Sequence, residues 1–142
     1  MGAREEAVVA EFLSHFKHDW PTDLDAPLKL VADDVTYQVV VPLTAVLHGR
    51  DAVKDEWQTM MERVSSQKHD LIAIGSGGRF VFTERVDHSQ MNDHWADIPL
   101  TAVFEVNEVG LITAWREYLD AGSVAAQHGM TLDQLRDSID NP

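Results

Sequence analysis

Two consecutive β-hairpins in the second half of the chain constrain its fold most strongly. The segments with strand-like sequence are 69–76, 79–87, 98–107 and 111–120. The glycine-rich stretch Gly75–Gly78 joins the first pair, and Asn107–Gly110 joins the second. Short turns of this kind connect antiparallel neighbours. Four such strands build one sheet, and its apolar face must be covered by other elements.

Helical patterns dominate the rest of the chain. Outside the hairpins we expect helix 4–18, a short helix 27–32, strand 35–43, a helix from Gly49 to 64, a polar loop 88–97, and one or two helices in a C-terminal tail, 123–142. Gly129 would separate the tail helices, and Thr131 is suited to cap the last one. Helices segregated from a mainly antiparallel sheet define an α+β fold. A chain of 142 residues suits one domain, 1–142.

Charge and composition exclude several classes of function. The formal net charge is −13, from 11 Lys and Arg against 24 Asp and Glu, which opposes binding to nucleic acid and to anionic membranes. The chain has no cysteine, so disulfides, thiolate metal sites and cysteine nucleophiles are excluded. Neither an apolar signal segment nor an apolar run near 18 residues is present, and a cytoplasmic protein is expected.

Two charged residues on one strand are the first candidates for a site. Arg85 and Asp87 are two residues apart and therefore point to the same face of a strand. Asp120 ends the last strand. If these three share a pocket, one carboxyl should keep its proton while the other stays ionised beside the guanidinium. That arrangement provides an acid and a base at the same pH. The ordinary alternative is a solvent-exposed ion pair.

Four short motifs resemble a known family. They are Tyr37–Gln38, Gly49–Val53 (GRDAV), Thr83–Asp87 (TERVD) and Trp115–Asp120 (WREYLD), in this order. Together they resemble the limonene-1,2-epoxide hydrolase family, within the larger NTF2-like group that includes polyketide cyclases and ketosteroid isomerases. The resemblance covers about residues 5–122. It implies a cone-shaped α+β fold, in which helices and a bent, mixed, mainly antiparallel sheet enclose a deep pocket, and a homodimer.

The resemblance also implies a reaction and its residues. Asp120 would take a proton from water as the water attacks an epoxide carbon. Asp87, kept protonated, would donate to the epoxide oxygen, while Arg85 bridges both acids and Tyr37 positions the water. The product would be a vicinal diol, with no metal or cofactor. Residues expected to line the substrate pocket are Val39, Trp57, Met60, Phe12, Phe16 and His48.

The chain departs from the family pattern at one position. The family holds its water partly with an asparagine two residues after the tyrosine, and here that residue is Val39. Gln38, His48 or Asn92 are possible substitutes. A substrate hydroxyl acting as the nucleophile needs no such clamp, so an epoxide-opening cyclase is an alternative. A non-catalytic binding module of the same fold is a second alternative.

Other chemistry has weaker support in the sequence. His88, Asp93, His94 and Asp97 lack the regular spacing of metal ligands and are better explained as a polar loop. The glycine-rich stretch 75–78 is not followed by the lysine and helix of a phosphate-binding loop. No G-x-S-x-G motif of a serine hydrolase is present.

Overall fold

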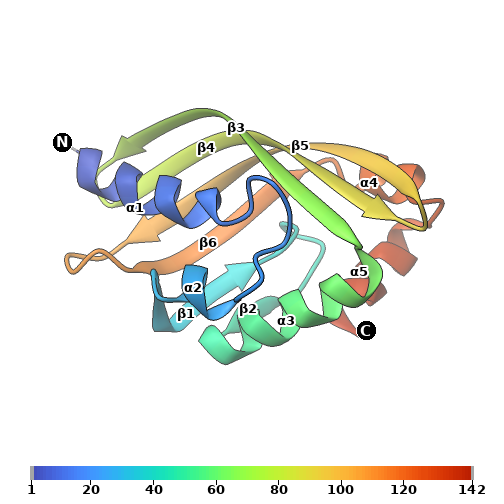
Figure 1. Cartoon of the computed structure of the whole chain (residues 1–142), viewed down its shortest axis with the longest axis horizontal. Coiled ribbons are helices and arrows are strands. Elements are labelled where there is room, and N and C mark those ends of the chain that lie inside the picture. Colours follow the sequence, from blue (N-terminus) through green and yellow to red (C-terminus); the bar gives the residue numbers. More distant parts are fainter. Residues whose placement is uncertain (1, 142) are drawn as a thin grey trace.

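One curved six-stranded sheet runs through the structure, a computed structural model that describes residues 2–141 (Figure 1). The strand order is β2-β1-β6-β5-β4-β3. Every neighbouring pair is antiparallel except β1 and β6, which are parallel. The strands are β1 (Val31–Gln38), β2 (Val46–His48), β3 (Ser66–Gly77), β4 (Phe80–Met91), β5 (His94–Val106) and β6 (Ile112–Leu119).

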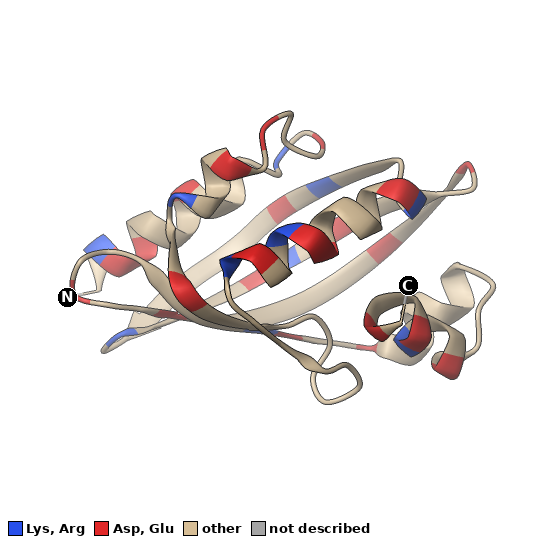
Figure 2. Ribbon diagram, turned by 90° about the horizontal axis from the view of Figure 1, so that it is seen from below, with Lys and Arg blue, Asp and Glu red and all other residues tan. Residues whose placement is uncertain are grey.

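The helices cover one face and one end of this sheet. They are α1 (Ala3–Ser14), α2 (Asp25–Leu28), α3 (Arg50–Arg63), α4 (Ala121–Gln127) and α5 (Leu132–Asp140). Helices α1 and α3 lie on the same side of the sheet, and α4 and α5 lie at one end of it (Figures 1 and 2). The predicted α+β class, with a curved and mainly antiparallel mixed sheet, is confirmed. None of the described helices is long and apolar enough to span a membrane.

The two hairpins form as predicted, but the segment between them does not form a loop. Strands β4 and β5 continue through it and are joined at Asn92 and Asp93, whose φ angles are 52° and 65°. Asn and Asp tolerate this left-handed conformation better than other residues with a side chain. The polar residues of 88–97 suggested a loop, yet several of them lie on the outer face of the sheet, where polarity is compatible with a strand.

The first third of the chain differs in detail from expectation, whereas the predicted cap of the last helix is confirmed. Strand β1 begins at Val31, so the predicted helix 27–32 is reduced to the single turn of α2. The three-residue strand β2 was not predicted, because so short a segment has no measurable alternation. Thr131 does cap α5: its hydroxyl accepts from the backbone N–H of Gln134 at 3.1 Å.

Aromatic side chains fill the space between α1, α3 and the sheet. Phe12 of α1 contacts Trp115 of β6, with ring centroids 5.4 Å apart, and Phe16 contacts Trp57 of α3 at 5.1 Å. Phe104 of β5 completes the cluster and is fully buried. Edge-to-face and offset contacts of this kind add to the stabilisation that comes from burial. This cluster supports the sheet beneath the polar residues described below.

On the outer face of the sheet, a histidine ties three strands together. His88 of β4 contacts Asp97 of β5 through Nδ1, at 2.7 Å, and Asp70 of β3 through Nε2, at 2.8 Å. The hydrogen bond that His88 donates to Asp97, together with the one that it donates to Asp70, raises the pKa of His88 above its usual value.

Replacing His88 should therefore change stability in a pH-dependent way. A histidine whose pKa is raised on folding stabilises the folded state fully below its unfolded pKa of about 6.5, and this stabilisation is lost as the pH rises through the folded pKa. His88→Gln should lower the free energy of unfolding by about 0.2–1 kcal/mol at pH 5.5 and by much less at pH 9. Urea unfolding at both pH values tests this, with the exposed His94→Gln as control. An equal loss at both pH values would contradict the assignment.

Candidate active site

A buried arginine connects two carboxylates on the concave side of the sheet. Arg85 of β4 donates through Nε to Asp87 Oδ1 at 2.8 Å, and through Nη2 to Asp87 Oδ2 at 3.3 Å. The same Nη2 also donates to Oε2 of Glu117 on β6. All three side chains are at least nine-tenths buried. The geometry is that of one guanidinium held between two acids, and it excludes the alternative of a solvent-exposed Arg85–Asp87 pair.

The strand register explains how residues on β4 and β6 meet across β5. Alternate residues of β4 point inward, and Arg85 and Asp87 belong to this set. Glu117 lies opposite Ala102 of β5, and Ala102 lies opposite Thr83 of β4. Because the side chain of Ala102 is a single methyl group, it leaves space for Arg85 to reach over β5. A larger residue at this position would occupy the path of the guanidinium.

Tyr37 enters the same network from β1. Its hydroxyl donates to Oε1 of Glu117, and its ring stacks on Trp115 with centroids 4.1 Å apart. Burial and the adjacent Glu117 carboxylate raise the pKa of Tyr37 well above its usual value, so it remains a phenol and a hydrogen-bond donor. Glu117 thus accepts one hydrogen bond from Tyr37 and one from Arg85.

Asp120 is not part of this network, which corrects the expectation from the sequence. Asp120 follows β6, is exposed, and caps α4 by accepting from the backbone N–H of Ser123 at 3.0 Å. The second acid is Glu117, three residues earlier in the same WREYLD motif. Strand alternation contains the signal that identifies it, because Glu117 shares its inward face with the buried Trp115.

The charges in the network determine which of its two acids keeps a proton. Burial would lower the pKa of Arg85, but the Asp87 and Glu117 carboxylates outweigh it and raise that pKa. Burial also raises the pKa of Asp87, and Arg85 only partly offsets this. One guanidinium cannot neutralise two buried carboxylates, so the proton is best placed on Asp87. The site then presents an acid with a raised pKa beside a second carboxyl group that accepts from both Arg85 and Tyr37.

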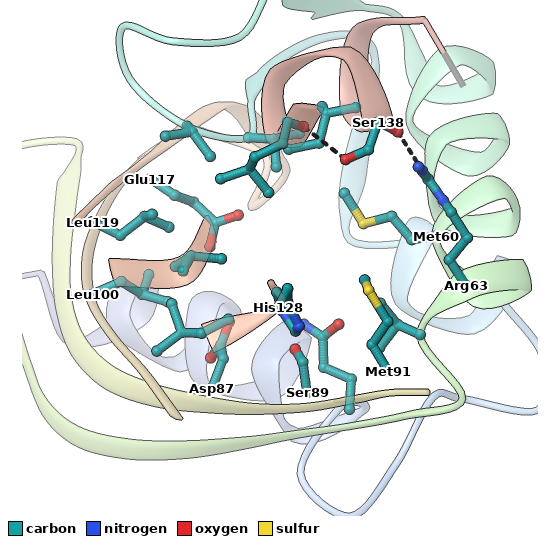
Figure 3. Close-up of a pocket in the computed structure, with 18 of the residues that line it drawn as sticks. Met60, Arg63, Asp87, Ser89, Met91, Leu100, Glu117, Leu119, His128 and Ser138 are labelled. Atoms are coloured by element: carbon teal, nitrogen blue, oxygen red, sulfur yellow. Dashed lines mark hydrogen bonds between the residues drawn. The ribbon is translucent and has the colours of Figure 1, made fainter. Parts of the chain in front are cut away.

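An apolar cavity opens from these acids. Its volume is about 130 Å³. Asp87 and Glu117 lie at its wall near Leu100 and Leu119, and Met60 is on the opposite side (Figure 3). The C-terminal helices complete the enclosure with Val124, His128, Leu135, Ser138 and Ile139. The segment expected only as a helical tail therefore forms part of the pocket wall.

The predicted pocket residues divide into three groups. Val39 and Met60 line the main cavity. Phe12, Phe16 and Trp57 are buried in the aromatic cluster and line a smaller adjoining space of about 40 Å³, which also reaches the acids. His48 is exposed on β2 and lines neither space.

The residues considered as substitutes for the missing asparagine do not reach the cavity. Gln38 donates to the carbonyl of Thr44 at 2.8 Å, and Asn92 lies in the β4–β5 turn. Val39 itself presents an apolar side chain to the cavity. Besides Tyr37 and the two acids, the polar residues that line the cavity are Arg63, Gln67, Ser89, His128 and Ser138. Among residues 2–141, no group of three or more His, Asp or Glu is arranged to hold a metal ion.

The fold around the buried site places the protein in a broad structural class. The structure is similar to an NTF2-like protein of unknown function from Burkholderia pseudomallei, with a TM-score of 0.77 and 14% identity over 88% of this chain and 97% of that one. It is also similar to the epoxide hydrolase/cyclase-like enzyme SalBIII, with a TM-score of 0.72 and 18% identity over 82% and 91% of the two chains. Both likenesses establish an NTF2-like fold.

The family follows from a match along most of the sequence. Residues 4–128 match the limonene-1,2-epoxide hydrolase catalytic domain, and the chain belongs to this family. An LEH-like epoxide hydrolase from M. tuberculosis is 26% identical over 87% of this chain and 88% of that one, with a TM-score of 0.74. The predicted family is therefore confirmed, and the comparisons support an epoxide-related hydrolase.

The central role of Arg85 can be tested through stability. Arg85→Met should lower the free energy of unfolding by about 3–5 kcal/mol, because removing one partner leaves buried carboxylates without compensation. Arg79→Met is the matched control: Arg79 forms an exposed pair with Glu105 at 3.4 Å, and its loss should cost less than about 1 kcal/mol. Guanidinium chloride unfolding at pH 7 measures both. Similar losses for the two variants would contradict the bridging role.

Proposed function

We propose that this protein is an epoxide hydrolase that converts a small-to-medium apolar epoxide into a vicinal diol in one step. The observation that carries the proposal is the buried Arg85 held between Asp87 and Glu117 at the wall of an apolar cavity. A non-catalytic binding module has no need for two acids around one buried guanidinium. Family membership supports the same reaction class.

The two acids would act together on water and epoxide. Glu117 accepts a proton from water as the water oxygen bonds to one epoxide carbon. The bond between that carbon and the epoxide oxygen breaks, and Asp87 delivers its proton to this oxygen. Water supplies one hydroxyl of the diol and the epoxide supplies the other. A positioned acid or base of this kind typically contributes about 10²–10⁴-fold in rate.

The remaining residues would hold this geometry. Arg85 keeps the two carboxyl groups at a fixed separation, and its planar guanidinium suits this bridging. Tyr37 orients the Glu117 carboxylate by donating to Oε1, which leaves Oε2 to Arg85. The apolar lining excludes bulk water, so the electrostatic contacts around the epoxide are stronger than in solvent.

The proposal is tested by turnover of a simple terpene or cyclohexene epoxide, with the diol as the measured product. Glu117→Gln and Asp87→Asn should each reduce kcat by about 10²–10⁴-fold, because each removes one proton-transfer group. Asp120→Asn is the matched control on the same motif. Asparagine caps a helix as well as aspartate does, so this variant should keep nearly full activity. Unchanged turnover in Glu117→Gln would refute the assignment.

A second candidate reaction is opening of the epoxide by a hydroxyl of the substrate itself. The apolar Val39 at the cavity wall favours it, since a valine gives an attacking water no hydrogen bond. SalBIII, which shares the fold, is described as acting in pyran ring formation. In this reaction Glu117 would take its proton from the substrate hydroxyl, and Asp87 would act as before.

Water labelled with a heavy oxygen isotope separates the two reactions. Hydrolysis should place one labelled oxygen in each diol molecule, because the nucleophile is solvent water. Ring closure should give a cyclic ether without label, because both oxygens come from the substrate. Mass spectrometry of the product provides the measurement, and a substrate that carries both an epoxide and a nearby hydroxyl allows either outcome. An unlabelled diol would contradict both mechanisms.

A further inference from the structure

The cavity has a second polar surface, which lies beyond Asp87 and which the reaction described above does not use. The inward-facing residues of β4 continue from Asp87 to Ser89, two positions further along the strand. Ser89 is only 5% exposed, and its side chain points into the cavity (Figure 3). Among residues 2–141, its hydroxyl has no hydrogen-bond partner. Buried polar groups are normally hydrogen-bonded, so this hydroxyl is available to a ligand in the cavity.

The strand register places an amide next to this hydroxyl. Gln67 of β3 is the cross-strand partner of Ser89. Directly opposite residues of an antiparallel pair point to the same face, with their Cβ atoms about 4.5–5.5 Å apart, and Gln67 also lines the cavity. Its amide nitrogen lies 3.1 Å from Nε2 of His69. Its amide oxygen makes no hydrogen bond within the described part of the chain, which leaves a second polar group for a ligand.

A third polar group comes from the helix that covers this end of the cavity. His128 directly follows α4 and lines the cavity. The amide of Gln127 donates to the carbonyl of Asp97 on β5 and accepts from its N–H, both at 2.9 Å. Asp97 follows Ala96, the cross-strand partner of Ser89, so the end of α4 is held at the level of Ser89. Burial lowers the pKa of His128, and at neutral pH its uncharged ring can both donate and accept.

The position of this polar surface relative to the two acids indicates what it can bind. Ser89 lies about 7 Å from Asp87 along β4, the rise of two residues of a strand. Through the register of β4, β5 and β6, Glu117 is level with Thr83. Along β4, Thr83 and Ser89 lie on opposite sides of Asp87. A substrate group at the polar surface is therefore near the acid that donates to the epoxide oxygen and away from the base, so it is bound without reacting.

We propose that Ser89, Gln67 and His128 form a subsite for a hydroxyl group of the substrate. The substrate is then an otherwise apolar epoxide that carries an alcohol a few carbons from the epoxide ring. A hydroxyl both donates and accepts, and these three side chains offer it donors and acceptors. None of the three carries a positive charge that would pair with a carboxylate or a phosphate. The inference rests on the proposed function for the reacting group, whereas binding of the alcohol does not.

Two epoxides that differ by one hydroxyl group test this subsite. One is a cyclohexene epoxide with an isopropyl group on the far side of the ring, and the other carries a hydroxyl on that isopropyl group. Wild-type protein should convert the hydroxylated epoxide with a kcat/KM about tenfold higher, as expected from one added hydrogen bond. Ser89→Ala should remove most of this preference, because alanine neither donates nor accepts. Equal kcat/KM values in the wild type, or an unchanged preference in Ser89→Ala, would overturn the proposal.

A second serine of the cavity provides the matched control. Ser138 lines the same cavity, but its hydroxyl already donates to the carbonyl of Leu135 at 2.6 Å. Ser138→Ala should therefore keep the preference for the hydroxylated epoxide. An equal loss of the preference in both serine variants would indicate a change in the shape of the cavity and would count against the subsite.

Binding of the two corresponding alkenes separates this proposal from the proposed reaction. Each alkene lacks the epoxide, so calorimetry can measure its affinity without turnover. The alkene with the hydroxyl should bind the wild type about tenfold more tightly than the other, and Ser89→Ala should bind the two alike. If this holds but no epoxide is converted, the subsite stands and the hydrolase proposal fails. If epoxides are converted without any preference for the hydroxyl, the hydrolase proposal stands and the subsite fails.

Discussion

The contact of Arg85 with Asp87 and Glu117 is the interaction on which the rest of this structure depends. A buried guanidinium is tolerated only where carboxylates pair with it. A single positive charge cannot neutralise two buried carboxylates, so one of the two acids is expected to keep its proton. This contact requires β4 and β6 to present their charged residues on the same face, with the small Ala102 of β5 between them. It also requires surroundings that exclude water, because solvent would weaken every charge interaction in the group.

The concave face of the sheet is packed differently on the two sides of this contact. On one side the aromatic cluster of Phe12, Phe16, Trp57, Phe104 and Trp115 packs tightly and provides the rigid support behind the acids. On the other side α3 and the α4–α5 segment enclose an open apolar cavity. The acids lie between the packed aromatic cluster and this cavity, and both of them line the cavity wall.

One residue distinguishes this site from the pattern that the family motifs imply. Val39 stands where an asparagine would help to hold water, and it makes the wall beside Tyr37 apolar. A valine offers a water molecule no hydrogen bond at this wall, so the polar groups nearest to it are those of Tyr37 and the acids.

The local periodicity of the sequence was sufficient to predict much of the fold and two of the site residues. Alternation along 79–87 placed Arg85 and Asp87 on one face, and the turn sequences predicted both hairpins. The same alternation, applied to 111–120, points to Glu117, which lies inward with Trp115. The family resemblance instead indicates Asp120, the acid that ends the motif, but a residue past the strand end no longer follows the strand's two-residue period.

By itself, the sequence determined most of the element types, the faces of the strands and the family, because these depend on patterns within a few neighbouring residues. Only the tertiary structure decided which acid pairs with Arg85, that His69 lies against Asp87, and that the C-terminal helices close the cavity. The contacts of Glu117 with Arg85 and Tyr37 join residues 32 and 80 positions apart in the chain, and they depend on strand register, sheet curvature and the size of the residues between them. No local pattern contains that information.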